Sequence, residues 1–135
     1  MSDGIKVSVI CIAYNQISYI EKMLDSVVSQ KTNFRFEVIV HDDASTDGTA
    51  DVIRSFSERY HELIIPILQV ENQYSKNVKV AFSLLPKARG EYLAFCEGDD
   101  YWCDTYKLQK QFDAMESNPN CSMCAVSYTH LRAHE

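Results

Sequence analysis

Two groups of acidic residues are the part of the sequence best suited to chemistry. Asp42 and Asp43 form the first group, and Glu97, Asp99 and Asp100 form the second. Carboxylates gathered at one place repel each other unless a cation shares them. Their hard oxygen atoms favour Mg²⁺ or Mn²⁺ over softer metals. If the fold brings the groups together, they predict a site where a divalent ion bridges this acidic protein and an anionic diphosphate.

The spacing of the second group makes it the stronger candidate. In an extended chain, residues two apart point the same way, so Glu97 and Asp99 would share one side. Gly98 between them leaves room for the backbone or phosphate of a ligand to approach. The alternative is that the acids are solvated loop residues and helix caps, the role we expect for Asp47 near a helix N-terminus. The residues alone leave both interpretations open.

The elements that must position these groups alternate between strands and helices. Apolar, β-branched runs predict strands at 7–13, 36–40, 63–70 and 92–96, and apolar residues at helical spacing predict a helix after each. The third run contains Pro66, which favours an edge position or a break. The pattern Ser18-Tyr19-Ile20-Glu21 predicts a capping box at the first helix. Residues Val78, Ala81, Phe82 and Leu85 predict the third helix, and Pro86 and Gly90 its end.

This alternation predicts an α/β fold, in which a Rossmann-like parallel sheet is flanked by helices. Ligands of such sheets bind at the carboxyl ends of the strands. Both acidic groups and the pair Tyr14-Asn15 follow strand ends. Three polar clusters are therefore expected to converge on one edge of one sheet.

Size, charge and cysteine usage limit the classes of function. The sequence has 135 residues, which suggests one domain, and its formal net charge of −6 argues against nucleic-acid binding, which needs a basic face. No run approaches the about 18 apolar residues that indicate a transmembrane helix. Cys11 and Cys96 lie in apolar strand-like runs, which predicts reduced thiols and a cytoplasmic protein.

Four segments resemble family 2 glycosyltransferases, which have the GT-A fold. They are VSVICIAYNQ at 7–16, VHDDASTDGT at 40–49, ARGEYLAFCEGDDYW at 88–102, and KLQKQ at 107–111 followed by NP at 118–119. The order and spacing of these segments are those of the family. The resemblance implies an incomplete GT-A nucleotide-sugar-binding domain over residues 1–124, the N-terminal half of that fold, and a non-family tail over 125–135.

The resemblance implies a nucleotide contact for the first two clusters. The loop formed by Ala13, Tyr14 and Asn15 would pack against the base, with Tyr14 stacked on uracil or its equivalent. The alternative for Tyr14 is an aromatic ring packed on the core. Asp43 would contact the base, and Asp42 would support it or close the loop.

The resemblance also assigns the third cluster. The DxD motif of the family maps to Glu97-Gly98-Asp99, in which Asp99 would be the ligand of Mg²⁺ or Mn²⁺. Glu97 stands where the family has Asp and is one methylene longer, and it would contact the ribose or a metal-bound water. Gly98 would lie beside the substrate, and Asp100 would orient the metal shell or the donor sugar.

The implied reaction is the transfer of a hexosyl-type sugar from a nucleoside-diphosphate sugar, with a UDP-sugar the first choice, to a hydroxyl group of a saccharide or lipid-linked acceptor. A metal ion acts as Lewis acid, and inversion of the anomeric centre is expected. Polysaccharide biosynthesis in bacteria is a common setting for such enzymes. The full-length protein is expected in the cytoplasm, with the inner face of the membrane as the alternative location.

The general base of the family, an Asp or Glu, is expected beyond Glu135. We therefore expect the 135-residue chain to be an inactive or nearly inactive fragment. The stretch at 127–135 resembles a translated sequencing-adapter run, so we expect a truncated reading frame and assign no role to His130 or His134.

Other functions and other residues stay open at this point. A non-catalytic nucleotide-sugar-binding module would keep the sheet and the acids, whereas a receiver-like phosphoacceptor domain would place its acidic pair after the first strand. A dinucleotide oxidoreductase is poorly supported because the turn at 13–16 lacks G-x-G-x-x-G. Lys76 and Arg89 could approach the diphosphate, or they are solvated surface charges. His41 could be a ligand, although an ordinary hydrogen-bonded histidine at a strand end is the stronger expectation.

Overall fold

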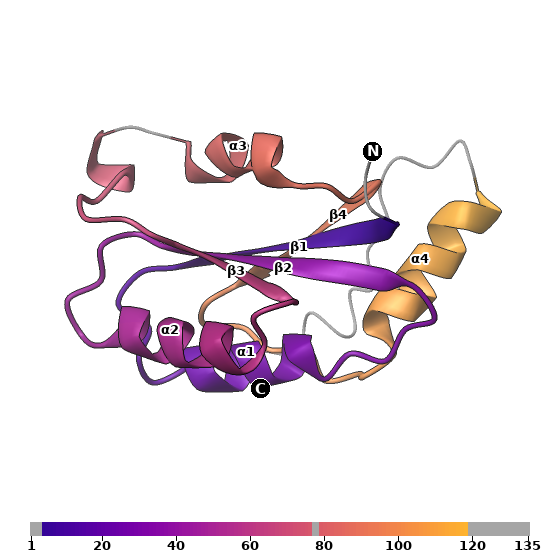
Figure 1. The fold of residues 1–135 in the computed structure, drawn as a ribbon, viewed down its shortest axis with the longest axis horizontal. Coiled ribbons are helices and arrows are strands. Elements are labelled where there is room, and N and C mark those ends of the chain that lie inside the picture. Colours follow the sequence, from indigo (N-terminus) through magenta and orange to yellow (C-terminus); the bar gives the residue numbers. More distant parts are fainter. Residues whose placement is uncertain (1–3, 77–78, 119–135) are drawn as a thin grey trace.

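A four-stranded parallel sheet forms the centre of the molecule (Figure 1). The computed structural model describes residues 4–76 and 79–118. The strands are β1 (Ile5–Ala13), β2 (Arg35–Asp42), β3 (Ile64–Leu68) and β4 (Tyr92–Glu97). They lie in the order β3-β2-β1-β4, and every neighbouring pair is parallel. The α/β fold predicted from the alternation of apolar runs is confirmed, and Pro66 lies in an edge strand as expected.

Helices cover both faces of this sheet. They are α1 (Ile20–Val28), α2 (Thr49–Arg59), α3 (Val80–Leu84) and α4 (Lys107–Ser117), with short 3₁₀ turns η1 (Tyr74–Lys76) and η2 (Leu85–Lys87). Figure 1 shows α1 and α2 on one face of the sheet, α3 on the opposite face, and α4 near the end where β2 begins. No helix in the described ranges is long and apolar enough to cross a membrane.

The core explains why the strands read as continuous apolar runs. Alternate residues of β1 belong to different clusters: Val9 and Cys11 pack with α1 and α2, and Ile10 packs with Val80 and Leu84 of α3. Both faces of the central strands are therefore buried, as in other parallel sheets. Each fully buried aliphatic side chain contributes about 1.5–3 kcal/mol to the free energy of unfolding. The core holds the ends of the strands, and so the loops that follow them, in fixed positions.

Two local predictions fail for identifiable reasons. The capping box is wrong: α1 begins at Ile20 and no side chain caps it. The carbonyl of Gln16 instead accepts the N–H groups of Tyr19 and Ile20, both at 2.9 Å, so the first turn is satisfied by backbone.

The third helix is also shorter than its apolar residues suggested. It ends at Leu84, and a 3₁₀ turn containing Pro86 follows. Among the described side chains of this helix, Val80 and Leu84 are buried against the sheet, while Phe82 is 66% exposed. Val78, which was expected to belong to this helix, lies outside the described residues.

Candidate functional site

The three polar clusters meet at the carboxyl edge of the sheet, as the sequence predicted. In the strand register Ala13 is the partner of Asp42, and Ile12 is the partner of Glu97. Backbone bonds continue this pairing past the strand ends. The N–H of Asp43 donates to the carbonyl of Ala13 (3.0 Å), and the N–H of Gly98 donates to the carbonyl of Ile12 (2.9 Å). The end of β1 therefore lies between the two acidic groups.

The loop after β1 is tied to the loop after β2 through Asn15. The Asn15 N–H donates to Ser45 Oγ (2.8 Å), and Asn15 Oδ1 accepts the N–H of Thr46 (2.8 Å). Asn15 has a φ of 50°, a left-handed conformation that asparagine tolerates better than most residues. The neighbouring Tyr14 is 48% exposed, so its side chain is not buried in the core.

Asp42 closes the loop after β2. Its buried carboxylate accepts the hydroxyl of Ser45 (2.5 Å) and the N–H of Ser45 (3.0 Å). Ala44 within this turn has a φ of 61°, a strained conformation for alanine of the kind that clusters at functional sites. Asp47 accepts the N–H groups of Thr49 and Ile17 (both 3.1 Å). The Thr49 hydroxyl also donates to Asp47 and holds the pKa of that carboxyl below its usual value.

Asp43 secures the segment that follows β3. Its carboxylate is buried and accepts the N–H groups of Gln73 (2.6 Å) and Tyr74 (3.0 Å), while its carbonyl accepts Nδ2 of Asn72 (3.0 Å). Each carboxylate oxygen has a second lone pair. Asp43 can therefore hold this segment and still accept a hydrogen bond from a ligand at the same edge.

The turn after β4 carries the second acidic group. Glu97 and Asp99 are exposed and Asp100 is buried, and the N–H of Asp100 donates to the carbonyl of Glu97 (3.0 Å). The expected room beside Gly98 is already filled by protein. A Cβ at this position would collide with Oε1 of Gln16 and would lie 2.9 Å from Cβ of Ala13. The glycine is thus required by packing against the loop after β1.

The acids create a negative field at this edge. Burial, followed by the charge of Asp100, raises the pKa of Cys96 to about 12, and the charges of Glu97 and Asp99 add to the increase. A divalent cation would be stabilised by the same charges. Within residues 4–76 and 79–118, no three acidic, histidine or cysteine side chains form a ready-made metal cluster. Magnesium-type ions commonly use one or two protein carboxylates together with phosphates of the substrate, and the exposed Glu97 and Asp99 fit that pattern.

His41 does not make the ordinary hydrogen bond that was expected. Its side chain is fully buried, and in the described part of the chain neither Nδ1 nor Nε2 has a hydrogen-bond partner. In the register it lies between Ile12 of β1 and Ile67 of β3. Burial lowers the pKa of His41, although the charges of Asp43 and Asp42 oppose this change. The lowered pKa favours the neutral imidazole, which lies in β2 directly before the acidic loop.

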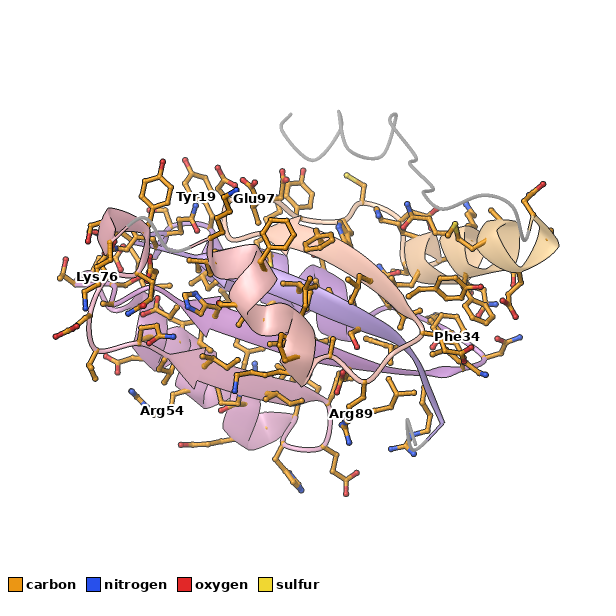
Figure 2. All side chains as sticks on the ribbon, turned by 90° about the horizontal axis from the view of Figure 1, so that it is seen from above. Tyr19, Phe34, Arg54, Lys76, Arg89 and Glu97 are labelled. Atoms are coloured by element: carbon orange, nitrogen blue, oxygen red, sulfur yellow. The ribbon has the colours of Figure 1, made fainter. Side chains whose placement is uncertain are left out.

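The two basic residues considered for the diphosphate have different positions. Lys76 lies in η1, just after the segment that Asp43 holds, and pairs with exposed Glu71. Arg89 precedes β4 at the opposite edge, where its Nε donates to Oε1 of buried Glu37 (2.9 Å). Figure 2 shows Arg89 on the side of the molecule away from Glu97. A role for Arg89 at the carboxyl edge is therefore wrong.

Comparison with known protein families identifies the family of this chain. The model of glycosyl transferase family 2 matches residues 8–132. The chain belongs to glycosyl transferase family 2. The match extends beyond Cys124, and the division into a domain at 1–124 and a tail at 125–135 stays a prediction. Membership in this family argues against the receiver-like alternative.

Curated relatives of this family 2 chain are considerably longer. Rv1520 of Mycobacterium tuberculosis is 46% identical over 118 residues, which cover 87% of this chain and 33% of the relative. WfaP of Escherichia coli, named as a UDP-Glc:α-D-GlcNAc-diphosphoundecaprenol β-1,3-glucosyltransferase, is 37% identical over 112 residues, which cover 82% of this chain and 41% of WfaP. The chain thus spans a third to under half the length of these two relatives.

Solved structures of similar fold include complexes with nucleotide sugars. TarS from S. aureus, in complex with UDP-GlcNAc, has a TM-score of 0.70 and 28% sequence identity over 85% of this chain and 32% of TarS. The mannosyltransferase PcManGT from Pyrobaculum calidifontis, in complex with GDP-Man and Mn²⁺, has a TM-score of 0.69 and 27% identity over 82% of this chain and 32% of PcManGT. The family 2 chain therefore has the sheet and helix arrangement of GT-A glycosyltransferases.

Several residues that organise this site of the family 2 chain were missed from the sequence. Gln16 contacts both the loop after β1 and the turn after β4, and Asn72 binds the backbone of Asp43. Gly98 and Asp43 are distant in sequence from Gln16 and Asn72, and contacts with the backbone leave no mark in a residue pattern. The available signal was position alone, since Gln16 ends the segment VSVICIAYNQ.

Proposed function

We propose that this chain is the donor-binding part of a glycosyltransferase that transfers a sugar from a nucleoside-diphosphate sugar, first a UDP-sugar, to a hydroxyl of a saccharide or lipid-linked acceptor. The observation that carries the proposal is the meeting of Tyr14, Asp43 and the Glu97–Asp99 turn at one sheet edge. Further support comes from relatives: TarS binds UDP-GlcNAc, and the name of WfaP specifies UDP-Glc as donor. Polysaccharide assembly in the cytoplasm is the proposed setting.

In this proposal Tyr14 and Asp43 bind the nucleoside. The half-exposed ring of Tyr14 stacks on the base, a contact worth about 1–3 kcal/mol for aromatic side chains on nucleic-acid bases. Asp43 accepts an N–H of the base through lone pairs that its bonds to Gln73 and Tyr74 leave available. Asp42 and Asn15 act indirectly, because their hydrogen bonds fix the two loops.

The diphosphate end is assigned to the turn after β4. A protein with a formal net charge of −6 binds an anionic diphosphate only with a local source of positive charge. Asp99 is the proposed ligand of Mg²⁺ or Mn²⁺, with Glu97 beside it and Asp100 orienting the shell. The bound ion would supply Lewis-acid stabilisation of the leaving diphosphate. The Mn²⁺ complex of PcManGT supports a divalent metal in similar proteins.

The transfer itself requires parts that we assign to a longer protein. A single in-line attack by the acceptor hydroxyl would invert the anomeric centre, and the hydroxyl needs a general base to take its proton. In this proposal that base lies outside the 135 residues, because the chain spans a third to under half of its relatives. The 135-residue chain is then a donor-binding unit without appreciable turnover.

Titration calorimetry tests this function. UDP, GDP and dTDP are titrated into the chain with and without Mn²⁺, using wild type, Asp99→Ala and the exposed-carboxylate control Asp113→Ala. We expect UDP to bind at least tenfold more tightly with Mn²⁺, and Asp99→Ala to lose this gain while Asp113→Ala keeps it. Equal UDP binding in all three proteins with and without Mn²⁺ would contradict the proposed metal site. A robust transferase rate from the 135-residue chain would contradict its assignment as a donor-binding unit alone.

A further inference from the structure

The backbone of Gln16 is hydrogen-bonded to the start of two helices. Its N–H donates to Oγ1 of Thr49 at the start of α2 (3.0 Å). Its carbonyl accepts the N–H groups of Tyr19 and Ile20 at the start of α1, both at 2.9 Å. The position of this residue is therefore set by the same core contacts that fix α1 and α2.

The side chain of Gln16 contacts both loops of the proposed donor site. Its Oε1 accepts the N–H of Tyr14 (3.3 Å) in the loop after β1. The same amide lies against Gly98 in the turn after β4, where a Cβ would collide with Oε1 and would lie 3.1 Å from Cδ. The amide of Gln16 thus fills the space between the two loops, and only a glycine at position 98 leaves that space free.

We propose that Gln16 is a positioning residue, which sets the separation between the Tyr14 loop and the Glu97–Asp99 turn. This inference rests on the proposed function, in which Tyr14 binds the base and Asp99 binds the metal. The covalent bonds of a nucleoside diphosphate limit how far its base and its phosphates can be apart, so both of its ends are bound well only if the two loops are held within that range. Preorganisation of this kind raises affinity because less ordering is required on binding.

The effect of Gln16 should therefore appear in the coupling between metal and nucleotide. UDP is titrated with and without Mn²⁺ into the 135-residue wild type, Gln16→Ala, Gly98→Ala and a control. We expect Gln16→Ala to reduce the Mn²⁺-dependent gain in UDP affinity about tenfold, with less than a twofold change in affinity without Mn²⁺. Gly98→Ala should have the same effect, because the new methyl group displaces the amide.

Gln109→Ala is the matched control. Oε1 of Gln109 also accepts a backbone N–H, that of Asn33 (2.7 Å), but it does so just before β2 at the amino edge of the sheet. This variant should leave the UDP affinity unchanged both with and without Mn²⁺. The comparison separates the loss of one amide–backbone hydrogen bond from the loss of the spacing between the two loops.

A double-mutant cycle in urea unfolding tests the contact itself. Gly98→Ala should lower the unfolding midpoint more in wild type than in Gln16→Ala, since the truncation removes the group with which the methyl collides. Additive midpoint shifts, or an unchanged Mn²⁺-dependent gain in Gln16→Ala, would overturn the inference. A wild type that does not bind UDP at all would instead overturn the proposed function, and the positioning role with it.

Discussion

At the scale of single residues, the acids at the sheet edge have different roles. Asp42 and Asp43 are buried and hold backbone N–H groups of neighbouring loops, whereas Glu97 and Asp99 are exposed. Buried carboxylates with backbone partners shape a site, and exposed ones are available to a cation. His41 lies directly behind the first pair and contributes no hydrogen bond to it within the described residues.

We predict that His41→Leu stabilises the protein. A buried polar group without a partner costs about 1–3 kcal/mol, and leucine is apolar like the register partners Ile12 and Ile67, so we expect a gain of about 1 kcal/mol in the free energy of unfolding. Since burial lowers the pKa of His41 from 6.5, the unfolded chain binds a proton that the folded chain does not. Wild-type stability should therefore fall as the pH drops below about 6.5.

Urea unfolding at pH 7.5, 6.5 and 5.5 measures both effects. In His41→Leu, the free energy of unfolding should fall less between pH 7.5 and 5.5 than in wild type. The variant His61→Gln, which changes an exposed histidine, should show the same fall as wild type. A His41→Leu protein with the same pH dependence as wild type would show that this imidazole is not the titrating group. A His41→Leu protein that is less stable than wild type would show that the imidazole makes a stabilising interaction in the folded protein.

At the scale of elements, one buried carboxylate connects three strands at the edge opposite the site. Glu37 of β2 accepts the hydroxyl of Ser8 in β1 (2.6 Å) and two hydrogen bonds from Arg89 (2.7 and 2.9 Å), which leads into β4. Burial alone would raise the pKa of Glu37, but the bonds from Arg89 and Ser8 outweigh it, and the pKa lies below 4.5. These hydrogen bonds link β1, β2 and the segment before β4 at the amino edge of the sheet.

Glu37→Ala is expected to destabilise the fold by about 1–3 kcal/mol, because the Ser8 hydroxyl and the N–H of Arg89 lose their acceptor, whereas the Arg89 side chain is 44% exposed and can be hydrated. Because the folded-state pKa is lowered, this stabilisation is present above pH 4.5 and is lost as the pH falls further. Urea unfolding at pH 7 and pH 4 would show the difference. Glu91→Ala breaks only an exposed pair with Lys6 and should cost at most about 1 kcal/mol. Equal costs for the two variants would contradict this account.

The elements also show how far sequence reasoning extends. The four strands and the convergence of their ends could be predicted, because strands buried on both faces leave a continuous apolar run and parallel strands share one carboxyl edge. The cap of α1 could not, since a carbonyl rather than a side chain satisfies it. The contact of Gln16 with Gly98 could not be predicted either, because it joins segments far apart in the chain. The same is true of the hydrogen bonds that the Asp43 carboxylate accepts from the N–H groups of Gln73 and Tyr74.

At the scale of the whole molecule, β4 is an edge strand of the described sheet, and two of its apolar side chains are exposed. Leu93 is 43% exposed and Phe95 is 55% exposed, and both lie on the α3 side because Ser8 and Ile10 are their register partners. Exposed edges with apolar side chains promote association between chains. A site near the ends of β1 and β4 would be affected by such association.

We predict that the 135-residue chain self-associates through this face. The double variant Leu93→Thr and Phe95→Thr should be monomeric at concentrations where wild type forms larger species, with a change in unfolding free energy below about 1 kcal/mol because both side chains are already half exposed. Sedimentation velocity measures the distribution. The variant Val70→Thr alters an exposed apolar residue away from β4 and should behave like wild type. A wild type that is monomeric throughout would refute the prediction.

The central claim is that a divalent ion and a nucleoside diphosphate bind together at the carboxyl edge of the sheet. Nuclear magnetic resonance with substoichiometric Mn²⁺ and UDP tests it directly, because the paramagnetic ion broadens nearby amide signals. Strong broadening is expected at residues 12–16, 43 and 97–100. Sharp signals are expected at 33–35 and 89–91, which lie at the other end of strands such as β1, roughly 26 Å long at 3.3 Å per residue. Broadening centred on the amino edge, or none at residues 97–100, would contradict the claim.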